Sequence, residues 1–235
     1  MQKFLAGFHT AFIENGRWHL YLDGVLSTIY VTFLALLMGV FLGVIVAVIR
    51  TAHDQQRPGK HNPFLGVANA VCKVYITVIR GTPMMVQLLI LGFVIFSSSR
   101  NFTLVGAFGL GLNSGAYVAE IARGGLMSVD SGQVEASRSL GMTYGTTMFH
   151  IVIPQAFKSI LPSLGNEFIT LFKDTALISV VGGKELVYAA RSIGAKTYNY
   201  MFPYVGIAIV YLIMVIIFSQ LQGKLERSLR QSDRR

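Results

Sequence analysis

The stretch that decides the fold runs from residue 24 to residue 49 and reads GVLSTIYVTFLALLMGVFLGVIVAVI, without one Asp, Glu, Lys or Arg. A helix needs about 20 residues to cross the hydrocarbon core of a bilayer, so this stretch is long enough to span a membrane. Three more uncharged windows follow, at 81–99, 101–119 and 197–223. This pattern is typical of a multi-pass membrane protein.

The composition supports a chain whose solvent is lipid. Of its 235 residues, 53% are hydrophobic and 13% are charged, against roughly 25% charged residues in soluble domains. Such values exclude a disordered chain, and they exclude an ordinary soluble enzyme domain, whose single core could not hide so much apolar surface. The net charge of +9 invites a nucleic-acid partner. We expect none, because the basic residues gather at the edges of the apolar windows and no nucleic-acid-binding motif is present.

We predict an all-α membrane protein with about five transmembrane helices. The predicted crossings lie at 24–49, 64–97, 101–123, 159–181 and 202–223. The second element is expected to start along the cytoplasmic interface and to break near Pro83, because proline disfavours helical geometry at the preceding residue. The fourth contains Glu167, Lys173 and Asp174, and these polar side chains can face other protein instead of lipid.

The distribution of Lys and Arg predicts the orientation. If the N-terminus is outside, the inside segments 50–63, 123–158 and 224–235 hold eleven Lys and Arg residues, and the outside segments hold six. The positive-inside rule therefore predicts that the N-terminus is outside and the C-terminus inside. We treat residues 1–235 as a single transmembrane domain with a cytoplasmic loop at 124–156.

Motifs for ATP, dinucleotide or metal chemistry are incomplete. A phosphate-binding loop needs Gly, four residues and then Gly-Lys-Ser/Thr, and the run from Gly182 to Glu185 fails at both ends. Gly109 and Gly111 resemble a dinucleotide turn, but the next glycine, Gly115, is one place too far. The five histidines never pair at helical ligand spacing. We therefore expect no catalytic site, no bound cofactor and no metal in this chain.

Pairs of small residues at spacing four suggest close packing between helices. Gly39 with Gly43, and Gly111 with Gly115, have this spacing inside apolar windows. In lipid, small residues at this spacing let two helix backbones approach each other. The pattern favours a compact bundle or a dimer.

The polar loop between the third and fourth crossings has the pattern of two short helices. Residues 135–140 read as one helix ended by Gly141, which can adopt a left-handed capping conformation. Thr143 can cap a second helix that ends before Pro154. Two small cytoplasmic helices suit docking into a groove on a partner, and a packed interfacial loop is the alternative.

The same loop resembles the EAA motif of ABC importer permeases. In that motif Glu-Ala-Ala is followed by three residues, Gly, nine residues, Ile, one residue and Leu-Pro. The matching residues here are Glu135, Ala136, Gly141, Ile151 and Pro154, at the spacing of the motif throughout. Ser137 replaces the third-position alanine and Ile153 replaces the leucine, and both changes are small in size.

Three other runs resemble the polar amino-acid permeases within that group. They are Arg80-Gly81-Thr82-Pro83-Met84-Met85-Val86-Gln87, the run from Leu112 to Ile121, and Asn166 to Ile169 with Lys173 to Thr175. The resemblance covers about residues 20–223. It implies a type I ABC importer permease fold and amino-acid uptake, without specifying which amino acid is carried.

The resemblance also implies partners. A second permease subunit, identical or homologous, would join this chain in a bacterial inner (plasma) membrane. A pair of cytoplasmic ABC ATPase subunits would bind ATP and Mg²⁺, and an extracytoplasmic amino-acid-binding protein would deliver the substrate. Residues Glu135, Ala136, Gly141, Ile151 and Pro154 would form the part that docks on the ATPase. The chain itself would be a non-catalytic subunit.

Charged residues at membrane depth are the candidates for the substrate path. Glu167 and Asp174 are seven residues apart, so on one helix they share a face about 10 Å apart along the axis. Both suit cationic groups of an amino acid, and the planar fork of Arg80 suits a carboxylate. Alternatively, Asp174 pairs with Lys173 or Arg80 and only holds the bundle together. Further hydrogen-bonding candidates are Gln87, Asn113 and Ser114.

One more carboxylate, Glu120, is expected to have a structural role. It lies one helical turn before Arg123, near the cytoplasmic end of the third crossing. At this spacing the two side chains face each other on a helix. We therefore predict an ion pair between Glu120 and Arg123.

Two other classes of protein compete with the importer. An ion-driven secondary amino-acid transporter usually shows internal repeats with broken helices in both halves, and no convincing repeat relates 24–97 to 101–223. A membrane sensor or channel subunit would not need a docking loop. Both therefore fit the sequence less well than an ATP-driven importer.

Overall fold

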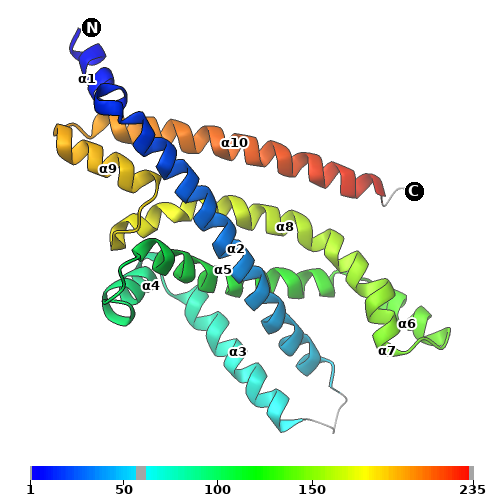
Figure 1. Cartoon of the computed structure of the whole chain (residues 1–235). Helices are drawn as coiled ribbons and strands as arrows, with labels where there is room; N and C mark the ends of the chain where they lie inside the picture. Colours follow the sequence, from blue (N-terminus) through cyan, green and yellow to red (C-terminus); the bar gives the residue numbers. More distant parts are fainter. Residues whose placement is uncertain (1, 57–61, 233–235) are drawn as a thin grey trace. The chain divides into compact units, whose positions relative to one another are not determined.

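In a computed structural model of the chain, residues 2–56 and 62–232 are described, and every regular element within them is a helix (Figure 1). The α-helices are α1 Gln2–Phe12, α2 Trp18–Asp54, α3 Pro63–Gly81, α4 Met84–Ile90, α5 Phe102–Met127, α6 Ser131–Ser139, α7 Tyr144–Thr147, α8 Ile153–Asp174, α9 Leu186–Thr197 and α10 Met201–Ser232. Two π-helical turns, Leu91–Ile95 and Met148–Val152, and two 3-10 segments, Glu14–Gly16 and Thr175–Val181, complete the series. The predicted all-α class is confirmed. The basic residues Arg57, Lys60, Arg234 and Arg235, which contribute to the predicted orientation, lie outside the described residues.

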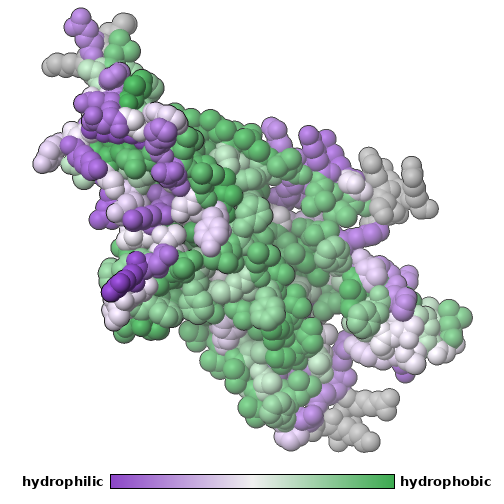
Figure 2. All heavy atoms as spheres, in the orientation of Figure 1, coloured by the Kyte–Doolittle hydropathy of each residue, from purple (hydrophilic) through white to green (hydrophobic). Residues whose placement is uncertain are grey.

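Among the described residues, four helical segments are long and apolar enough to cross a membrane. They are Glu14–Asp54, Pro63–Gly81, Phe102–Met127 and Met201–Leu229. Large apolar side chains stay exposed along them, and Figure 2 shows hydrophobic residues covering the long helices. The fifth predicted crossing, 159–181, falls on α8 and the following 3-10 segment, whose charged residues lower its hydropathy. That this segment crosses the membrane stays a prediction, as does the orientation of the chain.

Pro83 interrupts the second predicted element where the sequence places the break. Helix α3 ends at Gly81, and α4 begins at Met84, directly after an extended Pro83 with ψ of 133°. The 19 residues of α3 are by themselves long enough to cross a membrane. The sequence predicts one element from α3 to α4, because the apolar composition continues on both sides of the break.

The chain divides into two compact units, each with its own apolar core. The first unit comprises Met1–Leu37, Thr82–Gly111 and Phe168–Gln220. Its main core is formed by Val31, Ala35, Leu88, Ala107, Leu110, Leu171, Ile178 and Val181, which come from α2, α4, α5, α8 and the 3-10 segment Thr175–Val181. A second cluster in this unit joins α2, α9 and α10 through Tyr21, Leu186, Ala190, Ile193 and Ile207.

The second unit comprises Met38–Gly81, Leu112–Glu167 and Leu221–Arg235. Its core joins α2, α3 and α5 through Val46, Cys72, Ile76, Ala116 and Ala119. The predicted glycine packing is found here. A Cβ on Gly39 would lie 2.6 Å from Ser114 Oγ, and one on Gly43 would lie 2.7 Å from the Val118 side chain. Both glycines therefore let α2 approach α5 closely.

Candidate functional site

A hydrogen bond between α5 and α8 joins two of the predicted path residues. The Ser114 hydroxyl donates to Glu167 Oε1 over 2.8 Å. Ser114 is fully buried, since α2 passes over it at Gly39. The bond therefore turns one carboxylate oxygen of Glu167 toward α5, in the core of the second unit.

Arg80 belongs to a charged cluster around Glu120. Its Nη1 lies 3.8 Å from Glu120 Oε2, and its guanidinium carbon lies 5.1 Å from the centre of the Tyr117 ring. Arg50 Nη1 donates to Glu120 Oε1 over 2.5 Å. Two guanidinium groups thus share one carboxylate, and the cluster keeps one positive charge. A pairing of Arg80 with Asp174 gains no support from this arrangement.

The predicted pair between Glu120 and Arg123 is wrong. Arg123 Nη2 instead lies 3.3 Å from Asp54 Oδ2. The end of α2 runs beside the end of α5. Arg50 of α2 therefore pairs with Glu120 of α5, and Asp54, one turn further along α2, pairs with Arg123. Cross-helix partners of opposite sign replace the pair within one helix that spacing alone predicts.

The remaining path candidates are on three different elements. Gln87 lies in the first turn of α4, where its Nε2 donates to Thr82 Oγ1 over 2.8 Å and to Thr82 O over 3.1 Å. These bonds stabilise the chain across the break at Pro83. Asn113 is half-buried beside Ser114 on α5, and Asp174 is half-buried at the end of α8.

The predicted end of α6 at Gly141 is confirmed, while the helix begins four residues before the predicted start at residue 135. The Asp130 side chain begins the helix by accepting from Gly132 N over 2.6 Å. At the other end Gly141 N donates to Arg138 O and Met142 N donates to Ser137 O, over 3.0 and 3.1 Å. These two bonds form a Schellman motif, and Gly141 has the left-handed φ of 82° that the motif requires.

The second helix of the loop begins as predicted but ends elsewhere. Thr143 caps α7, because its Oγ1 accepts from Thr146 N over 3.3 Å. The chain then continues through the π-helical turn Met148–Val152 into α8, so Pro154 lies in the first turn of α8 and does not follow a helix end.

A buried pair of hydroxyl groups holds α6 against α7. Ser137 Oγ lies 2.9 Å from Thr147 Oγ1, and both side chains are almost completely buried. Ser137 is one of the two positions at which this sequence departs from the EAA motif. The hydroxyl that replaces the motif's methyl group has a partner ten residues later, which the motif does not indicate.

The outer surface of this helical segment is apolar in part. Leu140 is 84% exposed and Phe149 is 73% exposed, although both are large apolar residues. Glu135 and Ala136 are exposed on α6, while Ile151 is half-buried in the π-helical turn. We call α6, α7 and the π-helical turn Met148–Val152 the docking segment. Its exposed apolar residues have the character of an interaction surface.

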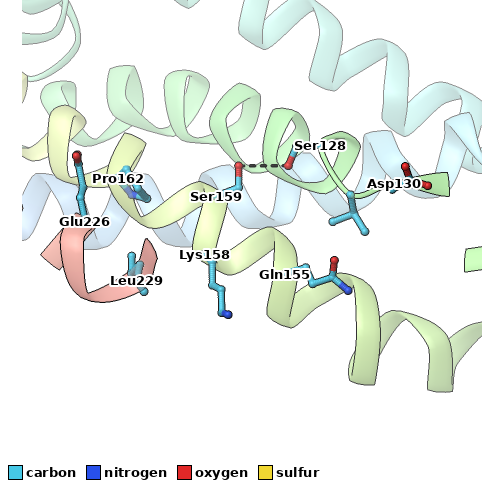
Figure 3. A pocket seen from close by; sticks show the side chains of 9 residues that line it. Ser128, Asp130, Gln155, Lys158, Ser159, Pro162, Glu226 and Leu229 are labelled. Atoms are coloured by element: carbon cyan, nitrogen blue, oxygen red, sulfur yellow. Dashed lines mark hydrogen bonds between the residues drawn. The ribbon is translucent and has the colours of Figure 1, made fainter. Parts of the chain in front are cut away.

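A polar hollow of about 650 Å³ opens beside the start of the docking segment (Figure 3). Asp130, which caps α6, is part of its lining, together with Lys158 from α8 and Glu226 from α10. The Ser128 hydroxyl donates to Ser159 Oγ over 3.2 Å and joins the end of α5 to α8 at this place. The first turn of α6 is therefore positioned by the same residues that shape the hollow.

Together, the apolar helices and the capped docking segment define a membrane permease subunit with a surface for a partner. The family described as "binding-protein-dependent transport system inner membrane component" matches residues 39–231. The chain belongs to this family.

Curated relatives are similar over nearly the whole chain. The arginine transport system permease protein ArtQ of Bacillus subtilis is 34% identical over 217 residues, which cover 90% of this chain and 93% of ArtQ. The L-cystine transport system permease protein TcyB of the same organism is 36% identical, with 92% and 89% covered. A putative glutamine transport system permease protein GlnP of Rickettsia bellii is 34% identical, with 88% and 91% covered.

Solved structures show the same fold. A chain from the crystal structure of an amino acid ABC transporter with histidines is 41% identical and has a TM-score of 0.79, with 89% of this chain and 94% of that chain covered. The MetNI methionine ABC transporter in an inward-facing conformation is 20% identical, with a TM-score of 0.76 and coverage of 92% and 99%. The expected type I ABC importer permease fold is confirmed, and no comparison supports the ion-driven alternative.

Proposed function

We propose that this chain is the permease subunit of an ATP-driven amino-acid importer and forms its translocation path by alternating access. The observation that carries the proposal is the docking segment, in which Glu135 is exposed on α6 and the large apolar residues Leu140 and Phe149 are exposed directly after the two capped helices. The similarity of the chain to arginine, cystine and glutamine permeases supports the substrate class. The chain binds no cofactor itself in this proposal, and ATP with Mg²⁺ is bound by the partner.

The docking segment provides the contact with a cytoplasmic ABC ATPase dimer. The Schellman motif at Gly141 sets the angle between α6 and α7, and the Ser137 and Thr147 hydroxyl groups hold it. A rigid pair of helices can transmit closure of the ATPase dimer to α8, because the π-helical turn connects the segment to α8 without an interruption. Glu135, Ala136, Gly141, Ile151 and Pro154 are the coupling residues in this proposal.

The remaining partners follow from the class of importer. A second permease subunit, identical or homologous, completes the membrane part, and an extracytoplasmic binding protein delivers the amino acid. The exposed apolar faces of the long helices are covered by lipid and by this second subunit. The complex lies in a bacterial inner membrane, with the docking segment on the cytoplasmic side.

The substrate path contains Glu167 and Asp174 for cationic groups and Arg80 for a carboxylate. Ser114 orients Glu167 through its hydrogen bond. Arg80 keeps an exposed fraction of 42% in its side chain, and Glu120 also has Arg50 as a partner, so Arg80 can turn to an anion. Gln87 and Asn113 add hydrogen-bonding groups to the path.

Reconstitution separates this function from ion-driven transport. The chain, its ATPase partner and its binding protein are placed in liposomes, and uptake of labelled amino acids is measured with ATP on the ATPase side or with a proton or sodium gradient alone. We expect uptake with ATP and none with a gradient alone. Uptake that depends on an ion gradient and does not depend on ATP would reject the proposal.

A further inference from the structure

Glu185 is a buried carboxyl group outside both the docking segment and the proposed path. It directly precedes α9, and only 1% of its surface is exposed. Its Oε2 accepts from Val187 N and its Oε1 from Tyr188 N, both over 2.7 Å. Both oxygens therefore cap the first turn of α9, whose N–H groups have no partner within the helix.

The same carboxyl group is tied to α10 and α2. The Tyr211 hydroxyl of α10 donates to Glu185 Oε2 over 3.1 Å. On the next residue, Leu186 N donates to Thr28 Oγ1 of α2 over 3.3 Å. A Cβ on Gly24 of α2 would lie 2.8 Å from Leu186 Cα, so α2 and the start of α9 are in close backbone contact.

The preceding residue, Lys184, fastens the segment to two further places. Its N–H donates to Thr103 Oγ1 of α5 over 2.8 Å, and its carbonyl accepts from the Ser27 hydroxyl of α2 over 2.6 Å. Residues 184–186 thus connect α2, α5 and α10 within the first unit. We call Lys184, Glu185 and Leu186 the α9 clamp.

No cation takes part in the described hydrogen bonds of the Glu185 carboxyl group. The titratable side chain that contacts it is Tyr211 of α10, and Tyr21 of α2 lies in the same apolar cluster as Leu186. The hydroxyl groups of Thr28 on α2 and Thr175 on the segment Thr175–Val181 interact with Tyr211 in turn. Burial raises the pKa of Glu185 from 4.5 to about 7, against the lowering effect of its hydrogen bonds. Glu185 lies between the predicted crossings 159–181 and 202–223.

The direction of this shift determines how the clamp depends on pH. Between pH 4.5 and about 7 the packed clamp keeps a proton that a hydrated Glu185 would release. The clamp is therefore most stable at the acid end of this window and loses stability as the pH rises through it.

We propose that Glu185 is a positioning residue of the transport cycle, which holds α9 on α2 and α10 while it is protonated and lets α9 loosen when the proton leaves. This inference rests on the proposed import function and on the predicted outward position of α9. A helix that loosens at this end of the chain lets α2 and α10 move separately, and such separation is needed for a path to open on the outer side. The pH outside the membrane then changes the rate of uptake.

Hydrogen exchange of the amides of residues 187–190 tests the clamp directly. It is measured by mass spectrometry on the complete importer between pH 5 and pH 8 and is corrected for the chemical exchange rate. We expect the protection of the wild type to fall by on the order of a hundredfold across this range, because each unit of pKa shift corresponds to a factor of ten. Glu185→Gln keeps the shape and removes the titration, so its protection stays constant.

Two further variants separate the clamp from a general effect on folding. In Tyr211→Phe the carboxylate loses a donor, so the fall in protection moves to higher pH. Glu14→Gln is the control. It neutralises a carboxylate that is also predicted to lie outside the membrane, but whose side chain is 45% exposed, and we expect it to show the wild-type dependence of protection on pH. If the protection of Glu185→Gln falls with pH as much as that of the wild type, the inference is overturned. It is also overturned if the fall in protection in Tyr211→Phe occurs at lower pH than in the wild type.

The pH profile of uptake tests the link to transport. We expect uptake by the wild type to change across pH 5 to 8 and uptake by Glu185→Gln to be flat. If Glu185→Gln only lowers uptake by one factor at every pH, the positioning role is wrong. If ATP-driven uptake is absent in the wild type while the exchange pattern is found, the proposed function is wrong and the clamp is retained.

Discussion

Ser114 on α5 donates a hydrogen bond of 2.8 Å to Glu167 on α8, and it does so under Gly39 of α2, which approaches Ser114 too closely to carry a side chain. Ser114 of α5 thus contacts both Gly39 of α2 and Glu167 of α8. A carboxylate at membrane depth is unfavourable without partners, and such residues mark a pathway or a paired site by default. Ser114 satisfies one oxygen of Glu167 and fixes the direction of the group.

Glu167→Gln is expected to lower amino-acid uptake at least tenfold in the reconstituted importer, because a neutral amide attracts a substrate ammonium group far less than a carboxylate. Ser114→Ala is expected to lower uptake about threefold, which corresponds to the loss of one hydrogen bond of about 0.5–1 kcal/mol. If Ser114 acts through Glu167, the double variant is no worse than Glu167→Gln alone. Fully additive losses would show that the two residues act independently.

Gly39→Ala is expected to lower uptake as Ser114→Ala does. The added Cβ would lie 2.6 Å from Ser114 Oγ, so the hydroxyl must leave its position and the bond to Glu167 is lost. Gly66→Ala is the matched control, because a Cβ there meets nothing within 4 Å. Equal uptake in both variants would contradict the packing of α2 on Ser114.

Glu120→Gln is expected to destabilise the solubilised protein by about 2 kcal/mol, because it leaves the buried guanidinium of Arg50, only 14% exposed in its side chain, without a carboxylate. Arg123→Gln breaks a more exposed pair with Asp54 and is expected to change the stability by less than about 1 kcal/mol. Thermal unfolding followed by tryptophan fluorescence measures both. A larger effect of Arg123→Gln would support the pair of Glu120 with Arg123 that spacing alone predicts.

Ser137→Ala restores the methyl group of the EAA motif and is expected to destabilise the docking segment by about 1–2 kcal/mol, because it leaves the buried Thr147 hydroxyl without its Ser137 partner. Thr147→Val alone is expected to cost less, since the Ser137 hydroxyl also donates to Val134 O over 2.8 Å. We expect the double variant to regain most of the stability lost in Ser137→Ala, because no buried hydroxyl then lacks its partner. Additive destabilisation, measured as a shift in the unfolding midpoint, would contradict a direct interaction between Ser137 and Thr147.

Local backbone chemistry was readable from the sequence, and partners across helices were not. Gly141 could be assigned as a cap because few residues other than glycine adopt a left-handed conformation, and Pro83 had to interrupt a helix. The partner of Glu120 depends on how the end of α2 lies beside α5, and spacing within one helix contains no information on that.

Glu185 shows the same limit. In the sequence, the run Gly182 to Glu185 fails as a phosphate-binding loop. A carboxylate directly before the apolar run Leu186–Ala190 is a signal for a helix cap. Its burial was not predictable, because it results from the packing of α2 and α10 on the start of α9.

The proposed coupling of ATP hydrolysis to transport through the docking segment can be tested with one pair of variants. Gly141→Ala forces a Cβ into a left-handed conformation at a cost of about 1–2 kcal/mol, although space is open around it. Gly145→Ala adds the same methyl group in α7, also in open space but without a positive φ. Substrate-stimulated ATP hydrolysis and uptake are measured together in the reconstituted complex. We predict that Gly141→Ala lowers the number of amino acids carried per ATP several-fold while Gly145→Ala keeps the wild-type ratio. A wild-type ratio in Gly141→Ala would show that the docking segment does not couple hydrolysis to transport.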